Sequence, residues 1–434
     1  MLLIYVEKIN PRIRYSFKMI FKNILKLKEY RLTTSSVDFI NYDGPKFSYG
    51  EKPLLEELFF KANGLLTQRG IHEQKIAIIE YKEIPAFFEV NSSTYPFDVF
   101  SAVFYMLSRY EEYLPYLRDK HDRFPLHQSL AFQHQFHQTA IVDRWCLQLK
   151  EFLIEQFPEL KFEERKYSFI PTYDIDNAYA YSHKGVLRTA ATLIKKLFNL
   201  QFNKIKIQFL VLLGKRKDPY DTYNYQMNIQ KKYHLNPIYF FLLGDYDNND
   251  KNLSHENRHF QSLIKLISDY AKVGIHPSYN SCNDAKVVKK EIKRLERIVK
   301  RDVQMSRQHF LKLEFPTTYR SLIEADVAED YSLGYAEDIG FRAGTCTPIN
   351  FYDLDEELER NLLILPFQIM ESTLMYYKKL KSYEVLDYVK PIIDEVKAVN
   401  GTLISLWHNE SLSDEEEWSG WGEVYENFIK YSVE

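Results

Sequence analysis

Residues 168–176 read SFIPTYDID, and this stretch decides the fold class expected for the chain. Its first six residues form an apolar run of the length typical of a buried strand. Asp174 and Asp176 follow at the point where that strand should end. A D-x-D pair offers two carboxylates, one able to hold a cation and one able to act as a base. Acidic residues also cap helices and fill turns, so the pair alone does not establish a function.

Outward from this stretch, strand-like runs alternate with helix-like patterns to the end of the chain. The expected strands are 168–173, 237–243, 272–275, 302–306, 339–342, 363–366 and 402–407. The expected helices are 186–200, 255–272, 284–301, 317–325, 354–361 and 383–399. This alternation predicts an α/β domain with a parallel sheet and helices outside it, either open or closed into a barrel.

The region before the alternation has a different pattern. Short strands are expected at 2–7, 31–33, 37–41 and 76–81, and helices at 12–27, 98–114 and 141–156. A proline and a cluster of charges then separate this region from the run that begins at 167. We therefore expect two domains, a smaller mixed α/β domain over 1–164, to which we assign no role, and a larger one over 165–434.

Polar residues follow five of the expected strands. They are Asp174 with Asp176, His276, Arg307, Arg342 and His408. A lone histidine or arginine at such a place is more often an ordinary hydrogen-bonded side chain than a functional one. Catalytic groups of parallel α/β folds lie at the C-terminal ends of the strands, however, so five such positions together predict one site.

Four short motifs carry a resemblance to a known family. They are Thr172–Asp176, Val273–His276, Arg307–Phe310 and Leu406–His408. In this order they resemble the first, second, third and closing motifs of the polysaccharide deacetylases, carbohydrate esterase family four. The resemblance spans about 167–432, and the stretches GIHPSY, RQHFL, GFRAG and LWHN resemble a branch with an extra N-terminal domain. Residues 97–115 are similar to part of that domain.

The resemblance implies a distorted (β/α) barrel that catalyses metal-dependent N-deacetylation. Asp174 would then act as the general base. Asp176 and His276 would bind a divalent metal, with zinc expected. Arg307 would orient the base or the acyl product, and His408 would protonate the leaving amine. This assignment is chemically coherent because a divalent cation polarises a carbonyl while separate groups handle the protons.

The implied substrate is an N-acetylated saccharide of a cell-surface polysaccharide or its precursor. Tyr279, Arg342 and Trp407 are the side chains expected to contact it. Tyr and Trp rings can stack on the faces of sugars while their polar atoms bind hydroxyls.

The chain departs from the family at the expected third metal ligand. The second histidine of the second motif falls at Asn280, whose amide oxygen is a poorer zinc ligand than imidazole. His309 replaces the proline of the third motif. One alternative is therefore an inactive carbohydrate-binding or scaffold protein on the deacetylase fold, and another is a different hydrolase on the same barrel. His255 and His259, spaced for one helix face, are a rival metal site.

Composition excludes several classes of function. The net charge of -3 gives no reason to expect nucleic acid as a partner, since phosphate binding needs a basic face. No apolar run approaches the length of a membrane span. Three widely separated cysteines suit a reducing compartment, and with no signal-peptide pattern we expect a cytoplasmic protein.

Overall fold

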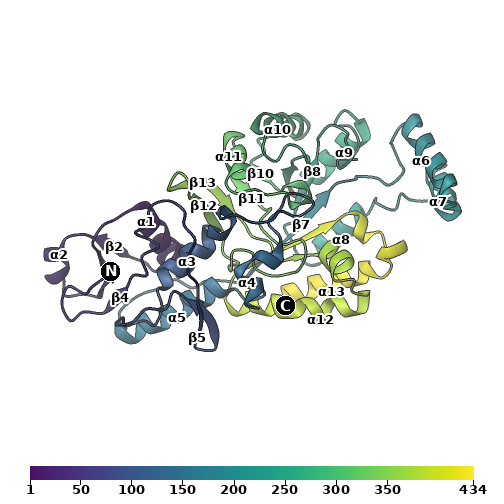
Figure 1. Ribbon diagram of the computed structural model, residues 1–434. Helices are drawn as coiled ribbons and strands as arrows, with labels where there is room; N and C mark the ends of the chain where they lie inside the picture. The colour runs from purple at the N-terminus through teal and green to yellow at the C-terminus, as the bar shows by residue number, and fades with distance from the viewer.

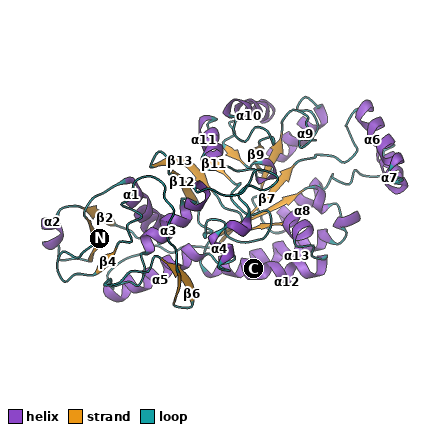
Figure 2. Cartoon of the chain, in the orientation of Figure 1, coloured by secondary structure: helices purple, strands orange, loops and turns teal.

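The computed structural model describes residues 1–434, and its chain folds into two sheet-containing parts that lie side by side (Figure 1). The N-terminal part contains a four-stranded parallel sheet and a separate hairpin. The C-terminal part contains a nine-stranded sheet flanked by helices (Figure 2). No helix is both long and apolar enough to cross a membrane.

The N-terminal sheet has the strand order β2-β1-β3-β4. Its strands are β1 (Leu2–Val6), β2 (Tyr30–Thr33), β3 (Lys46–Gly50) and β4 (Phe59–Lys61), and the hairpin is β5 (Ile78–Tyr81) with β6 (Ile84–Phe87). The helices are α1 (Pro11–Phe17), α2 (Ser36–Ile40), α3 (Val99–Leu107), α4 (Leu130–Gln133) and α5 (Ile141–Gln156), and a π-helix follows α1 at Lys18–Ile24.

Most elements predicted in this part are confirmed, and α5 has the predicted bounds. The strand predicted at 37–41 is wrong, because the segment forms α2. Its start is fixed by the Ser35 hydroxyl, which accepts a hydrogen bond from the N–H of Asp38 at 3.1 Å. Such a cap satisfies a backbone donor at the first turn of a helix.

The nine-stranded sheet has the order β12-β13-β11-β10-β9-β8-β7-β15-β14. Its strands are β7 (Ser168–Ile175), β8 (Ile238–Leu242), β9 (Lys272–His276), β10 (Met305–Ser306), β11 (Glu329–Asp330), β12 (Ile349–Asp353), β13 (Leu358–Ile364), β14 (Ile369–Met370) and β15 (Thr402–His408). All neighbouring strands are parallel except β12 and β13. The prediction of a mixed α/β fold built on a mainly parallel sheet is confirmed.

The helices of this part are α6 (Val186–Phe198), α7 (Phe202–Leu212), α8 (Tyr223–Lys232), α9 (Arg258–Ser268), α10 (Ala285–Val299), α11 (Thr317–Glu324), α12 (Ser382–Ala398) and α13 (Trp421–Val433). Two predicted elements are wrong. Residues 339–342 form a loop, and most of 354–361 forms a turn and the start of β13. Here an antiparallel partner, β12, decides the conformation of a sequence that reads as helical.

A closed barrel is not confirmed, because the edge strands β12 and β14 do not pair with each other. The sheet is nevertheless curled. Residues 358–370 run from β13, which pairs with β11, to β14, which pairs with β15. Between them Phe367 donates its N–H to the Leu333 carbonyl at 3.1 Å, and Gln368 donates to that of Ile404 at 3.0 Å. One chain segment therefore bridges strands from opposite sides of the sheet.

Two apolar clusters reflect this curl. The larger, of 96 buried residues, contains side chains from both parts of the chain, including all the apolar residues of α3. The smaller has ten buried residues and joins β8, β14 and β15 to the segments after β11 and β13. Neighbouring strands lie about 4.8 Å apart, so side chains from strands this distant in a flat sheet could not touch.

Candidate active site

Side chains from four strands meet at the C-terminal end of the curled sheet. These side chains are Asp174 in β7, Asp176 just after it, His276 at the end of β9, Arg307 and His309 after β10, and His408 at the end of β15. In a flat sheet β7 and β10 would lie about 14 Å apart. The curl brings Arg307 Nη1 to 3.1 Å from Asp174 Oδ1.

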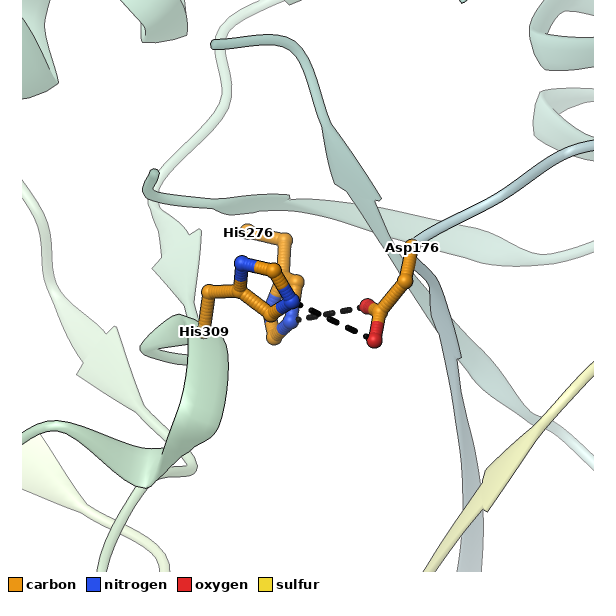
Figure 3. A group of neighbouring side chains, drawn as sticks. All are labelled: Asp176, His276 and His309. Atoms are coloured by element: carbon orange, nitrogen blue, oxygen red, sulfur yellow. Dashed lines mark ion pairs between the residues drawn. The ribbon is translucent and has the colours of Figure 1, made fainter. Parts of the chain in front are cut away.

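Asp176, His276 and His309 point toward one another (Figure 3) and form a group able to hold a metal ion. The ligand atoms of the three lie within 4.8 Å of one another. His276 Nε2 lies 3.2 Å from Asp176 Oδ1, and His309 Nε2 lies 3.3 Å from Asp176 Oδ2. Two imidazoles and one carboxylate are a ligand set that catalytic zinc sites use.

Hydrogen bonds on the far side of both rings leave their Nε2 atoms facing Asp176. His276 Nδ1 lies 2.6 Å from the backbone oxygen of Arg307, and His309 Nδ1 lies 2.8 Å from Asp250 Oδ1. Both partners can only accept, so each Nδ1 carries the hydrogen. This arrangement fixes the tautomer that a metal-binding histidine needs.

Charge in the group agrees with a site built for a cation. Although burial alone would lower it, the Asp176 and Asp250 carboxylates raise the pKa of His309 to about 9. Burial alone would raise the pKa of Asp176, but the facing imidazoles of His309, His276 and His408 hold it well below its ordinary value. Asp176 Oδ1 is buried and accepts no hydrogen bond, so its lone pairs are available to a cation.

Asp174 is fixed beside the group by Arg307. Asp174 is buried, and its Oδ1 accepts from Arg307 Nη1 at 3.1 Å. The same nitrogen donates to the Thr172 hydroxyl oxygen, and Arg307 Nε donates to the Tyr331 carbonyl at 2.9 Å. Asp174 Oδ2 lies 3.8 Å from His276 Nε2. The guanidinium thus fixes a buried carboxylate next to the proposed metal position.

His408 also lies close to Asp176. Its Nε2 lies 3.6 Å from Asp176 Oδ2, and its Nδ1 donates to Glu371 Oε1 at 2.7 Å. Burial opposes a charge on His408, but the carboxylates of Glu371 and Asp176 hold its pKa well above the ordinary value. Glu371 is fully buried just after β14. His408 is therefore held as a proton donor.

The group opens into a cavity of about 200 Å³. Its wall contains Asp174, Asp176, His276, His309 and His408 together with Arg123, Gln308, Phe310, Leu311, Ala336, Met370, Ser372, Tyr376, Tyr377 and Leu406. Arg123 comes from the N-terminal part of the chain and donates to the Phe310 carbonyl at 2.9 Å. The N-terminal part therefore contributes to the mouth of the cavity.

Asn280, the expected third ligand, lies outside the group. Its side chain is exposed and donates to Asp247 Oδ2 at 2.7 Å. The loop turns away because Glu291 accepts from both the N–H and the hydroxyl of Ser278, at 3.0 and 2.6 Å. His309 occupies the place that the second motif was expected to fill.

Arg342 and Trp407 also lie away from the cavity, unlike the placement expected for substrate contacts. Arg342 is buried between the two parts of the chain, where both oxygens of Glu112 accept from it at 2.9 and 2.5 Å. Trp407 alternates with Leu406, so it points to the other face of β15 and packs on Tyr425 at a ring distance of 4.7 Å. Tyr279 does not line the cavity but packs against Phe310, which does.

The rival pair His255 and His259 is not brought together with a third ligand. His259 is exposed and stacks on His183 at a ring distance of 3.8 Å. Sequence reasoning missed the roles of Asp250 and Glu371, because each hydrogen-bonds a histidine more than 35 residues away. The replacement of a proline by His309 was the one signal in the sequence for the third ligand.

Comparisons with known proteins give one family match and several distantly similar structures. Residues 2–158 match the model of a family described as "Family of unknown function (DUF7033)", which is less than half of the chain. No curated protein matches the sequence.

Several solved structures share a distant likeness with about three-fifths of the chain. A candidate polysaccharide deacetylase from Mycobacterium smegmatis is 11% identical in sequence. The alignment covers 62% of this chain and 85% of that protein's chain, with a TM-score of 0.41. A polysaccharide deacetylase from Bacillus cereus is 12% identical, with coverages of 62% and 86% and a TM-score of 0.29. A CE4 family pseudoenzyme from Bacillus anthracis is 11% identical, with coverages of 61% and 61% and a TM-score of 0.28.

Proposed function

We propose that the protein is a metal-dependent hydrolase that removes N-acetyl groups from a saccharide. The observation that carries the proposal is the convergence of Asp176, His276 and His309 on one point, with Asp174 close to His276 and His408 close to Asp176. Amide hydrolysis needs an activated water, a stabilised oxyanion and a proton for the departing amine. The site offers a group for each.

Asp176, His276 and His309 would hold the cation. A divalent ion such as zinc supplies polarisation of the acetyl carbonyl and a lowered pKa for water. The two Nδ1–H hydrogen bonds of His276 and His309 keep their rings in place without rearrangement.

Asp174 is the proposed base, because it is a carboxylate at the cavity wall with one oxygen 3.8 Å from His276 Nε2. Arg307 orients it through the contact between Arg307 Nη1 and Asp174 Oδ1. Asp174 would therefore accept a proton from the attacking water.

His408 is the proposed acid, because Glu371 stabilises its protonated form and its Nε2 faces the cavity. It would donate that proton to the nitrogen of the departing amine. The proton taken up by Asp174 and the proton given by His408 then account for one hydrolysis of an amide.

A saccharide fits the mouth of the cavity, where aromatic and polar groups alternate. Phe310, Tyr376 and Tyr377 provide ring faces, and Arg123 provides N–H donors. Rings of this kind stack on sugar faces, while donors bind hydroxyl or carbonyl oxygens. Tyr279, which packs on Phe310, is proposed as an outer contact for a longer chain.

The test is to measure bound metal and acetate release with the purified protein and N-acetylated saccharides. Wild-type protein should bind one zinc or cobalt ion and release acetate. Asp174→Asn should keep the metal and lose the acetate release, because Asp174 moves a proton and is not among the three proposed ligands.

Two results would contradict the proposal. Protein that takes up no metal after incubation with zinc or cobalt would leave the group without its role. Tight metal binding with no acetate release from any tested sugar would favour a sugar-binding protein that has kept the deacetylase site.

A further inference from the structure

Helices α6 and α7 stand apart from the rest of the molecule as a helical hairpin, at the right of Figure 1. The hairpin is inserted between β7 and β8, and it begins ten residues beyond Asp176. It plays no part in the site described above. Its surface differs from the rest of the chain in two ways, apolar exposure and charge.

Ten apolar side chains of the hairpin are exposed to solvent. In α6 they are Val186 (85% exposed), Leu187 (88%), Ile194 (55%), Leu197 (55%) and Phe198 (83%). At about 100° per residue these positions fall on one face of the helix. The turn and α7 add Leu200 (72%), Phe202 (60%), Phe209 (50%), Leu212 (44%) and Leu213 (66%).

The buried residues of the two helices are two polar ones and one valine, Val211. Lys196 and Gln208 are buried, and Lys196 Nζ donates to Gln208 Oε1 at 2.7 Å. The Lys196 ammonium also lies 3.9 Å from the centre of the Tyr181 ring. An amphipathic helix of a globular protein normally turns its apolar stripe toward the core. Here the stripe is turned outward, as in a helix whose partner is apolar and external.

The charge of the segment points to the nature of that partner. Between residues 184 and 217 the chain has no acidic residue and nine basic ones, namely Lys184, Arg188, Lys195, Lys196, Lys204, Lys206, Lys215, Arg216 and Lys217, although its overall net charge is -3. Three of them, Lys195, Lys206 and Lys215, are exposed and have no acidic partner within 4.0 Å. A partner that binds both the exposed apolar side chains and the basic side chains has an apolar interior and an anionic surface.

We propose that the α6–α7 hairpin binds the surface of an anionic lipid bilayer. Helices of 13 and 11 residues are about 20 and 16 Å long, too short to span the hydrocarbon core. They would lie in the plane of the interface, with the Leu and Phe side chains among the acyl chains and the lysines at the lipid phosphates. This proposal does not depend on the activity of the site.

Contacts of the hairpin with the body relate this surface to the cavity. Arg216 pairs with Glu415 at 2.6 Å, and Lys204 pairs with Glu416 at 2.6 Å. Both acids lie shortly after His408 at the end of β15. Because the hairpin itself follows the end of β7, membrane contact would occur at the end of the sheet that carries the cavity.

The test is cosedimentation of the full chain with vesicles of phosphatidylcholine alone or of phosphatidylcholine with phosphatidylglycerol. Wild-type protein should bind the anionic vesicles, and added salt should weaken the binding because it screens the lysines. The triple variant Leu187→Ser, Phe198→Ser, Phe202→Ser should bind at least about tenfold more weakly, because three exposed apolar side chains no longer enter the interface. Lys195→Glu with Lys206→Glu should weaken binding by about fivefold or more per lysine.

Matched controls use apolar residues exposed on other surfaces. Leu117→Ser and Tyr383→Ser remove side chains that are 80% and 73% exposed, and they should bind the vesicles as wild type does. All these variants should unfold thermally as wild type does, because the replaced side chains are exposed.

Three outcomes would overturn the proposal. The first is wild-type protein that stays in solution with anionic vesicles. The second is equal loss of binding in the Leu117 and Tyr383 controls. The third is a soluble dimer that the triple variant converts to monomer, without vesicle binding in either form, which would make a second copy of the chain the partner of the hairpin.

Discussion

Two buried clusters of charged side chains in this protein differ in whether all their polar atoms have partners. In the first, between the two parts of the chain, Glu112 binds Arg109 at 2.8 Å and Arg342 at 2.5 Å, and all three side chains are at most 3% exposed. Each oxygen of Glu112 has a partner within the cluster. This network is closed, and no cavity of the site reaches it.

In the second cluster, at the sheet end, buried atoms are left without partners. They are Asp176 Oδ1, Arg307 Nη2 and Glu371 Oε2. A buried polar atom without a partner costs about 1–3 kcal/mol, so such atoms beside a cavity need a reason. Closed networks hold the fold together, whereas an open one prepares a site for a ligand. Arg342 and Arg307 look alike in the sequence, and only this difference separates them.

Breaking the closed network should have the largest effect on stability. Glu112→Gln should lower the free energy of unfolding by about 3–5 kcal/mol, because two buried arginines lose their shared counter-charge. Chemical denaturation measures this loss, and metal affinity should not change. Burial opposes a low value, but Arg342 and Arg109 hold the pKa of Glu112 below its ordinary range. Its contribution is therefore present above about pH 4.5 and is lost as pH falls through the lowered pKa.

The open cluster should respond in the opposite way, with metal affinity lost and the fold retained. His309→Ala should weaken zinc binding by more than about 100-fold, because removing a ligand should exceed the 10–100-fold typical of a ligand's hydrogen-bond partner. Isothermal titration with zinc measures the affinity. Asn280→Ala is the matched control and should bind zinc as wild type does, since that side chain is exposed and outside the group. A loss of zinc affinity in Asn280→Ala, with none in His309→Ala, would place the third ligand at Asn280 instead.

A smaller effect should follow from the partner of His309. Asp250→Asn keeps the shape of the side chain but removes the charge that fixes the ring through Nδ1. Zinc affinity should fall by about 10–100-fold. An unchanged affinity would show that His309 is oriented by packing alone. The exposed substitution Asp245→Asn, on the same loop, should have no effect on zinc binding.

The smallest effect is expected in the pH dependence of acetate release. Burial lowers the pKa of His408, and the charge of Glu371 is the strongest influence that raises it. Glu371→Gln removes this charge and should therefore lower the pKa of His408. His408 then loses its proton at a lower pH than in wild type. The alkaline limb of the profile of rate against pH should therefore move to lower pH by about one pH unit or more. Protonated His408 also contributes to the free energy of unfolding. This contribution is present below the pKa of the unfolded state and is lost as pH rises through the pKa of the folded state, and it should be smaller in Glu371→Gln. An unmoved alkaline limb would exclude His408 as the acid.

Much of the scaffold could be predicted from local pattern. The apolar runs at 168–173 and 402–407 form adjacent strands β7 and β15, and the helical periodicity at 186–200 gives α6. Pattern failed where a distant partner decides the conformation. Residues 354–361 read as helical, yet pairing with β12 makes most of them turn and strand. The periodicity of the sequence also predicts an apolar stripe on α6, but it does not predict whether that stripe faces the core or the solvent.

The sequence by itself determined most of the parallel strands and the order of the motifs, because these depend on residues close together in the chain. Only the tertiary structure decided which side chains meet. Asn280 is turned away because Glu291 holds Ser278, and His309 takes its place because the curl brings the end of β10 to the end of β7. Asp250 joins the site from the loop after β8, and Glu371 from the helical turn after β14. Such contacts arise from the curvature of the sheet, a property of the whole domain that no short stretch of sequence encodes.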